Sequence, residues 1–211
     1  MKGKIRLFSI ALTAVILVTA CSEAGKEDEY HDWQARNEAY TDSLAQVVTA
    51  LEKRGVNIGN ATEGDMFRIL SYKLDPSVSD WGADNYVYCK VVKKGDGSVS
   101  PIFSDSISIN YRGRLIPTSG HPEGFVFEQT YKTAQITPES NVPGALVLSE
   151  LVPGMVTAIS CMKKGDIWRI TIPYRLGYDK TKKSSIPAYS NLIFDLHLAD
   201  FSHGGSEIEI K

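Results

Sequence analysis

Histidine and cysteine are scarce in this sequence, with four histidines and three cysteines among 211 residues. The histidines show no paired spacing of the kind that metal ligands use, so the sequence gives no reason to expect a metal site. A glycine-rich phosphate loop and a Gly-X-Ser-X-Gly motif are both missing, which argues against nucleotide binding and serine-hydrolase chemistry. We therefore expect no cofactor.

An excess of charge of one sign is missing as well. The formal net charge is −2, and no long basic run occurs beyond the extreme N-terminus. Nucleic acid is therefore not expected as a partner. Hydrophobic residues nevertheless make up 43% of the chain, which is enough to bury a core of ordinary size.

The chain begins with a short basic segment, followed by an apolar run from Leu7 to Val18 that is too short for a typical membrane span. Small residues then lead to Cys21. Together these features predict a signal peptide over residues 1–20. The cysteine resembles that of a bacterial lipobox, so we expect Cys21 to carry a lipid that anchors the protein in the cell envelope. An ordinary secretory signal, followed by a cysteine by chance, is the alternative. Residues 21–29 follow as an acidic tether.

Cys89 and Cys161 are the two remaining cysteines. An exported protein can keep a disulfide, but nothing in their spacing pairs them. We favour two small buried hydrophobic side chains over a disulfide.

Residues 30–54 show a helical pattern that ends before Gly55. Its stripe recurs at spacings of three and four and contains one polar position, as in short coiled coils: Trp33, Asn37, Tyr40, Leu44, Val47 and Leu51. The stripe predicts either a helix packed on its own domain or a homodimer formed through residues 30–54.

The rest of the chain reads as strands around one short helix. Residues 65–74 are either a short helix or a strand, and Lys94–Gly97 is a strong turn signal. Pro153 suits the first turn of a helix, whose apolar side holds Met155, Val156, Ile159 and Met162. Strand-like patterns cover residues 86–92, 106–115, 146–148, 167–173 and 191–201. In the last of these, Asp195 and His197 share the face expected to be solvated. The pattern predicts an α+β fold with an antiparallel sheet.

Six segments carry a resemblance to a known family. They are Ser108–Leu115, Phe125–Glu128, Glu150–Met155, Met162–Asp166, Leu176–Tyr178 and Leu192–Leu196. In order and spacing they resemble the FKBP family of peptidyl-prolyl cis/trans isomerases over about residues 86–201. The resemblance implies an antiparallel sheet wrapped around one short helix, after an N-terminal helical extension. We divide the chain into residues 1–20 (signal peptide), 21–29 (tether), 30–85 (helical extension), 86–203 (FKBP-like domain) and 204–211 (tail).

The same resemblance implies an apolar pocket lined by aromatic side chains. The positions matching the family's catalytic wall are Tyr111, Phe127, Glu128, Tyr178 and Phe194, and those matching its substrate-binding positions are Leu151, Val152, Met155 and Ile186. Glu128 replaces the usual aspartate, Met155 the tryptophan of the pocket floor, and Gly177 and Asp179 the usual alanine and glycine around the tyrosine. Ser185 stands where an apolar residue is common. Two insertions lie near Thr118–Gly124 and Ala134–Gly144.

These residues predict an isomerase that acts on proline-containing peptides or client proteins at the cell envelope. An FKBP-like lipoprotein that lacks isomerase activity and binds a partner protein or peptide is the alternative. A structural lipoprotein that makes its contacts through the N-terminal helix is a third hypothesis. The lysines at 180, 182 and 183 would bias the site towards acidic partners.

Overall fold

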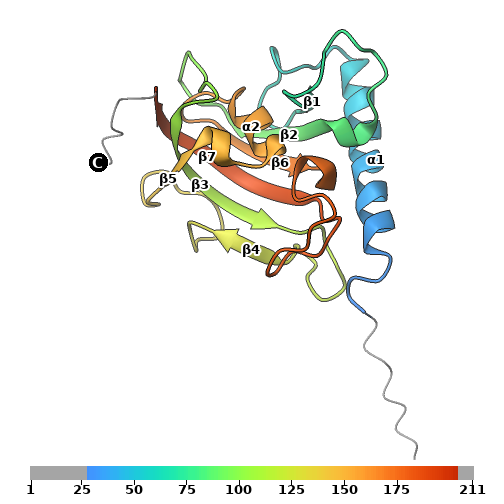
Figure 1. Ribbon diagram of the computed structural model, residues 1–211. Helices are drawn as coiled ribbons and strands as arrows, with labels where there is room; N and C mark the ends of the chain where they lie inside the picture. Colours follow the sequence, from blue (N-terminus) through green and yellow to red (C-terminus); the bar gives the residue numbers. More distant parts are fainter. Residues whose placement is uncertain (1–27, 204–211) are drawn as a thin grey trace, which may run out of the picture.

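The computed structural model of the protein describes residues 28–203. A single antiparallel sheet, with strand order β1-β2-β6-β7-β3-β4 and β5 also paired with β3, forms its centre (Figure 1). The strands are β1 (Met66–Leu70), β2 (Tyr86–Lys93), β3 (Ser106–Arg114), β4 (Val126–Gln129), β5 (Gly144–Val147), β6 (Ile167–Ile172) and β7 (Leu192–Ser202). The helices are α1 (Trp33–Glu52) and α2 (Pro153–Ile159), with 3-10 turns η1 (Ala83–Asn85), η2 (Leu148–Glu150) and η3 (Tyr174–Leu176). The predicted α+β class with an antiparallel sheet is confirmed.

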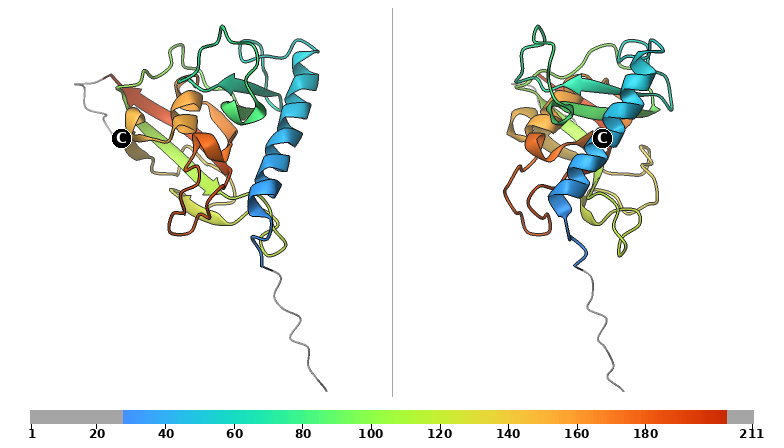
Figure 2. Two further views of the ribbon diagram at one scale, coloured as in Figure 1. Left: turned by 45° about the vertical axis from the view of Figure 1, so that its right-hand side comes forward. Right: turned by 90° about the vertical axis from the view of Figure 1, so that its right-hand side faces the viewer.

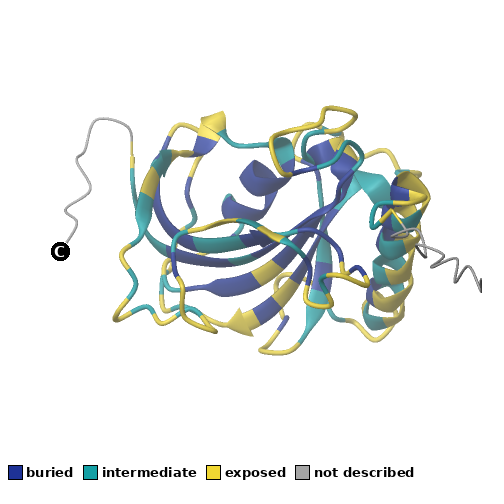
Figure 3. Cartoon of the chain, turned by 90° about the horizontal axis from the view of Figure 1, so that it is seen from below, coloured by how far each residue is buried: buried dark blue, intermediate teal, exposed yellow. Residues whose placement is uncertain are grey.

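The long strands β3 and β7 form the middle of the sheet. They pair antiparallel from Ser106 with Ser202 to Arg114 with Ile193. Because side chains alternate between the two faces of a strand, each of these strands serves both faces of the sheet. The inner face packs on α2, which Figure 3 shows buried between the sheet and the surrounding loops.

Helix α2 begins at Pro153, as the sequence predicts, because proline lacks an N–H that the first turn would leave unpaired anyway. Every residue from Gly154 to Ile159 is buried. Gly154 permits the close contact with β6, since a Cβ added there would lie 2.3 Å from Cγ2 of Ile172. The helix therefore packs directly on the inner face of the sheet.

Helix α1 lies along the outside of the domain, on the side away from the C-terminal end of β7 (Figure 2). Asn191 binds it with three hydrogen bonds: its N–H donates to Asn37 Oδ1 (2.7 Å), and its amide Nδ2 donates to Asn37 O (2.7 Å) and Thr41 Oγ1 (2.9 Å). Trp33 Nε1 donates to Ser190 Oγ at 2.8 Å. The helix thus packs against its own domain, which is one of the two predicted arrangements. Self-association through residues 30–54 stays a prediction.

The buried face of α1 differs from the predicted stripe. Thr41 and Val48 are buried although they lie outside the predicted stripe. Val47, a member of the stripe, is 47% exposed. Trp33, Asn37 and Thr41 are buried at a spacing of four residues. This face turns inward because Asn37 and Thr41 bind Asn191 through their polar groups. The sequence pattern did not reveal this polar contact.

Two further segments differ from the predictions or resolve an ambiguity in them. Residues 65–74 contain strand β1, which pairs with β2, so the segment expected as a helical extension also adds an edge strand to the sheet. Lys94–Gly97 is not a hairpin turn but a loop pressed against the segment after α2. A Cβ on Gly95 would lie 2.1 Å from the carbonyl oxygen of Lys164, so glycine serves close packing there.

The thiols of Cys89 and Cys161 are free, as favoured from the sequence. Among the helices within residues 28–203, none has the length and apolar character needed to cross a membrane. The predicted signal peptide, the predicted lipidation site Cys21 and the tail at 204–211 lie outside the described residues.

Candidate functional site

Three aromatic rings from three different strands meet on the inner face of the sheet. Phe194 of β7 lies edge-on to Phe127 of β4, with ring centroids 5.6 Å apart and an interplanar angle of 87°. Tyr111 of β3 approaches Phe194 at 6.1 Å and 65°. Edge-to-face pairs of this kind contribute about 0.5–1.5 kcal/mol beyond their buried area. They fix the ring orientations and form an apolar wall.

Gly113 makes room for this wall. A Cβ at this position would lie 2.4 Å from Cε2 of Phe127 and 2.7 Å from Cε1 of Phe194. Any side chain here would displace both rings. The sequence analysis did not single out Gly113, although it lies within the Tyr-Arg-Gly-Arg motif on which the resemblance rests. Its role is visible only when β4 and β7 are placed on either side of β3.

A register shift brings two consecutive residues of β4 to the same site. Neighbouring residues of a strand normally point to opposite faces. The pairing of β3 with β4 is shifted between Gly113 and Arg114, and such irregularities redirect side chains. As a result Phe127 contacts Phe194, while the carboxylate of Glu128 lies near enough to Tyr111 to raise the pKa of its hydroxyl.

The carboxylate of Glu128 affects both tyrosines of the site. Burial raises the pKa of Tyr111, and the hydrogen bond with Glu128 and its negative charge raise that pKa further. Burial also raises the pKa of Tyr178, again with a contribution from the charge of Glu128. Both phenols therefore stay protonated at neutral pH and remain available as hydrogen-bond donors. The longer glutamate side chain still reaches the tyrosine, so replacement of the family's usual aspartate leaves this contact in place.

The floor of the site comes from the N-terminal end of α2. Met155 is buried and takes the position where the family usually has tryptophan, and Leu151 and Val152 are half-buried beside it. The backbone N–H of Val152 donates no hydrogen bond to any described residue. An N-cap amide without a partner among the described residues is available to a bound peptide.

The segment after η3 closes the site on one side and carries Tyr178 and Ile186. The N–H of Lys183 donates to the carbonyl of Ile186 at 2.9 Å, and the N–H of Tyr189 donates to that of Asp179 at 2.9 Å. Asp179 has a φ of 51°, in the left-handed region where aspartate is tolerated better than most residues. The departure from the usual glycine at this position is therefore compatible with the turn. The Lys183 ammonium lies 5.2 Å from the ring centroid of Tyr178.

The sequence-predicted residues form one connected region. Met155, Ile186 and Phe194 belong to the hydrophobic core cluster, and five partly buried side chains pack against it: Tyr111, Phe127, Leu151, Val152 and Tyr178. Glu128 is exposed beside Tyr111. Cys21 lies outside the described residues. Within residues 28–203, no three His, Cys, Asp or Glu side chains lie together as a metal site would need. The catalytic and binding roles of the nine residues stay predictions.

Asp195 and His197 are not solvated, contrary to expectation. The Asp195 side chain is 15% exposed and His197 is 6% exposed. Burial lowers the pKa of His197, and the nearby charge of Lys93 lowers it further. Both residues do lie on the outer face of the sheet, but the insertion between β4 and β5 covers that face.

Comparison with known proteins agrees with this geometry. A family model described as FKBP-type peptidyl-prolyl cis-trans isomerase matches residues 98–199. A macrophage infectivity potentiator from Trypanosoma cruzi is 32% identical over 115 residues, which cover 54% of this chain and 52% of that protein. An FKBP-type 22 kDa peptidyl-prolyl cis-trans isomerase from Escherichia coli is 28% identical over 112 residues, covering 53% of this chain and 48% of that protein. The chain thus spans about half the length of these curated relatives.

A solved structure of similar fold is a peptidyl-prolyl cis-trans isomerase from Pseudomonas syringae pv. tomato, with a TM-score of 0.51 and 19% sequence identity. The match covers 85% of this chain and 100% of that one. At this identity the likeness concerns the fold alone. The family model, the motifs and the aromatic site agree on one conclusion. Residues 98–199 carry an FKBP-type peptidyl-prolyl cis-trans isomerase domain.

Proposed function

We propose that the protein is a peptidyl-prolyl cis/trans isomerase that acts on proline-containing segments of client proteins at the bacterial cell envelope. The observation that carries the proposal is the aromatic wall of Tyr111, Phe127 and Phe194, which Gly113 makes possible. The family match supports the reaction type. The envelope location rests on the signal peptide and Cys21 expected from the sequence.

Isomerisation needs no acid, base or nucleophile. The barrier to rotation about a peptide bond is ~18–20 kcal/mol, because the C–N bond has partial double-bond character. The planar amide is charge-separated and the twisted amide is much less so. An apolar wall that removes water from the amide penalises the planar state more than the twisted one. The packed rings of Phe127 and Phe194 would supply this apolar environment.

Hydrogen bonds would hold the substrate backbone while the bond turns. The unpaired N–H of Val152 would donate to a substrate carbonyl, and the protonated hydroxyl of Tyr178 would donate to another. Glu128 would act indirectly, because its negative charge helps to keep the hydroxyls of Tyr111 and Tyr178 protonated. Shape and anchoring together would select the twisted state over the planar one.

A direct assay tests the proposal. We would measure cis-to-trans conversion of a Leu-Pro-Phe peptide with the full-length protein in detergent, by exchange spectroscopy. Phe127→Ala opens the wall and should lower kcat/KM about tenfold or more, equivalent to roughly 1.4 kcal/mol of transition-state stabilisation. Val99→Ala, in a loop where Val99 is 61% exposed, is the matched control and should change nothing. Wild-type protein that only reproduces the uncatalysed rate would refute catalysis.

The second candidate is a binding module without isomerase activity. The observation that favours it is Met155, which replaces a flat ring of the pocket floor with a flexible chain. Such a pocket could hold a proline-containing peptide without favouring the twisted bond. Binding of the Leu-Pro-Phe peptide, measured by calorimetry without rate enhancement, would establish this alternative.

A further inference from the structure

A loop between η3 and β7 borders the aromatic site, and we call its residues 179–189 the flap. The two ends of the flap are joined, because the N–H of Tyr189 donates to the carbonyl of Asp179 at 2.9 Å. Tyr178 lies directly before the flap, and Ile186 lies within it. The position of the flap therefore sets where these two side chains would meet a bound peptide.

Both ends of the flap have an unusual backbone conformation. Asp179 has a φ of 51° and Tyr189 has a φ of 61°. A bulky residue such as tyrosine rarely adopts this left-handed region. Strained residues of this kind persist where the surrounding structure holds them, and they cluster at active sites and ligand clamps. Contacts from outside the flap must therefore hold Tyr189 in place.

Helix α1 holds the C-terminal end of the flap through a chain of two hydrogen bonds. Nε1 of Trp33 donates to Oγ of Ser190 at 2.8 Å, and Oγ of Ser190 donates to the carbonyl of Pro187 at 2.7 Å. Trp33 and Ser190 are both buried, so water competes little for the bond between them. Because Pro187 directly follows Ile186, the chain leads from α1 to the backbone beside a predicted peptide-binding residue.

The same helix also holds the segment that precedes the flap. Oδ1 of Asn191 accepts a hydrogen bond from the N–H of Tyr174 at 2.9 Å, while Nδ2 of Asn191 donates to α1. The hydroxyl of Tyr174 donates to Oε1 of Glu38 in α1 at 3.1 Å. The ring of Tyr174 packs on that of Tyr189, with centroids 5.5 Å apart. Both ends of the flap are thus bound to the first half of α1, which lies beside them in Figure 2.

We propose that Trp33 and Ser190 are positioning residues of the aromatic site, through which α1 holds the flap in the arrangement that a proline-containing peptide requires. The inference rests on the proposed isomerase function and deepens it, because it makes the N-terminal extension a part of the site. A flap that is already in place costs less entropy when a peptide binds. A loosened flap would be competent for only a fraction of the time, and apparent affinity and rate would fall by that fraction.

The first test uses Ser190→Ala in the full-length protein in detergent. The change removes the acceptor for Trp33 and the donor to Pro187. We expect kcat/KM for the Leu-Pro-Phe peptide to fall about threefold to tenfold, as for the loss of a hydrogen bond. Amide hydrogen exchange should speed up at Lys183 and Tyr189, whose N–H groups are bonded to carbonyls of the flap itself.

Val48→Ala is the matched control for a loss of stability alone. Val48 is fully buried in α1 and lies about 20 Å along the helix from Trp33. The change removes buried methyl groups and should lower the midpoint of urea unfolding. It should leave kcat/KM and the exchange of the flap amides at their wild-type values, because it does not touch the hydrogen-bond chain.

A double-mutant cycle tests the chain itself. Trp33→Phe keeps an aromatic ring but lacks the N–H, so it should cause part of the loss seen in Ser190→Ala. In the Ser190→Ala background it should add nothing, because Trp33 acts on the flap through the serine hydroxyl. Additive losses would overturn the chain as the route from α1 to the flap.

Other outcomes would also overturn the proposal. One is wild-type kcat/KM and unchanged flap exchange in Ser190→Ala. Another is an equal loss of kcat/KM in Val48→Ala, which would assign the effect to general stability. A wild type that binds Leu-Pro-Phe without speeding its conversion would refute the isomerase function alone. Kd would then decide the positioning role, since Ser190→Ala should raise it about threefold to tenfold and an unchanged Kd would refute that role. A wild type that neither binds nor converts the peptide would refute both.

Discussion

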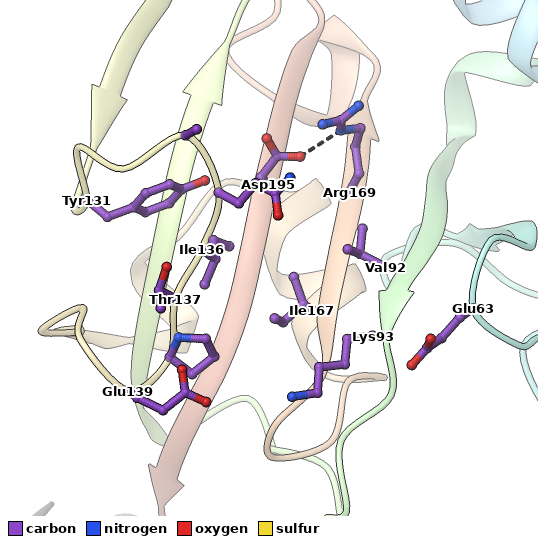
Figure 4. Close-up of a pocket in the computed structure, with 13 residues that line it drawn as sticks. Glu63, Val92, Lys93, Tyr131, Ile136, Thr137, Glu139, Ile167, Arg169 and Asp195 are labelled. Carbon is purple, nitrogen blue, oxygen red and sulfur yellow. Dashed lines mark hydrogen bonds and ion pairs between the residues drawn. The ribbon is translucent and has the colours of Figure 1, made fainter.

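Phe194 and Asp195 are neighbours in β7 and serve opposite faces of the sheet. The ring of Phe194 lies edge-on to Phe127 in the aromatic site, while the carboxylate of Asp195 binds Arg114 and Arg169 on the outer face (Figure 4). One strand therefore supports an aromatic cluster on one face and an ion-pair network on the other.

Gly113→Ala should lower both activity and stability. The new Cβ would lie 2.4 Å from the ring of Phe127, so the rings must move, at a cost of about 1–3 kcal/mol for overpacking. We expect a lower midpoint in urea and a clear loss of kcat/KM. Gly144→Ala is the matched control, because its Cβ would meet only Thr130 Cγ2 at 3.8 Å. Equal behaviour of the two variants would contradict the role assigned to Gly113.

Tyr178→Phe should reduce turnover modestly. The change removes one hydrogen-bond donor from the site, and such a bond contributes about 0.5–1.5 kcal/mol. Burial and the charge of Glu128 raise the pKa of Tyr178. Its hydroxyl therefore stays protonated at any pH below the usual tyrosine pKa. The rate of the wild type should therefore show no fall from Tyr178 ionisation up to about pH 10. A pH–rate profile that declines near neutrality would point to another group.

Met155→Trp should raise isomerase activity if the flexible floor limits catalysis. Tryptophan would restore the flat ring usual in the family, at some risk of overpacking beside the buried end of α2. Met155→Leu conserves volume without adding a ring and should leave kcat/KM near the wild-type value. Thermal denaturation of each variant separates a damaged fold from an unimproved site. A higher kcat/KM in the Met155→Leu variant would argue against the tryptophan ring as the cause of any gain.

Asn191→Ala should loosen α1 from the domain. The change removes the two hydrogen bonds that the side-chain amide donates to Asn37 O and Thr41 Oγ1, while the backbone N–H still donates to Asn37 Oδ1. It also leaves the buried N–H of Tyr174 without its acceptor, and each orphaned group costs about 1–3 kcal/mol. Urea unfolding should show the loss, with an early change in the fluorescence of Trp33. Gln46→Ala, on the exposed side of α1, should be neutral. An unfolding midpoint equal to wild type would mean that the side-chain amide of Asn191 does not help to hold α1.

Cys21→Ser should abolish membrane anchoring, because the lipid would be attached through the thiol. Fractionation of cells that express the variant should show released or unprocessed protein. Cys161→Ser is the control and should stay in the membrane fraction. Full processing and membrane retention of the Cys21 variant would refute the lipid-anchor hypothesis and favour the ordinary secretory signal.

The sequence alone determined the elements whose signals are local. Pro153 begins α2 because its missing N–H suits a first turn, and the alternation along residues 192–198 places Phe194 inward and Asp195 outward. The order of the motifs also predicts the family and the three rings that meet in the aromatic wall, Tyr111, Phe127 and Phe194. These features depend on neighbours within a few residues, or on a pattern carried by the motifs themselves.

Tertiary structure decided what depends on distant contacts. Asn191 selects the buried face of α1 from 150 and 154 residues away in the sequence, through Thr41 and Asn37. Gly113 matters only because Phe127 and Phe194 come to it from two other strands. Asp195 and His197 are shielded because the insertion after β4 folds over a sheet face that alternation alone would leave in water. Side-chain periodicity states which face a residue occupies, but only the packed chain states what covers that face.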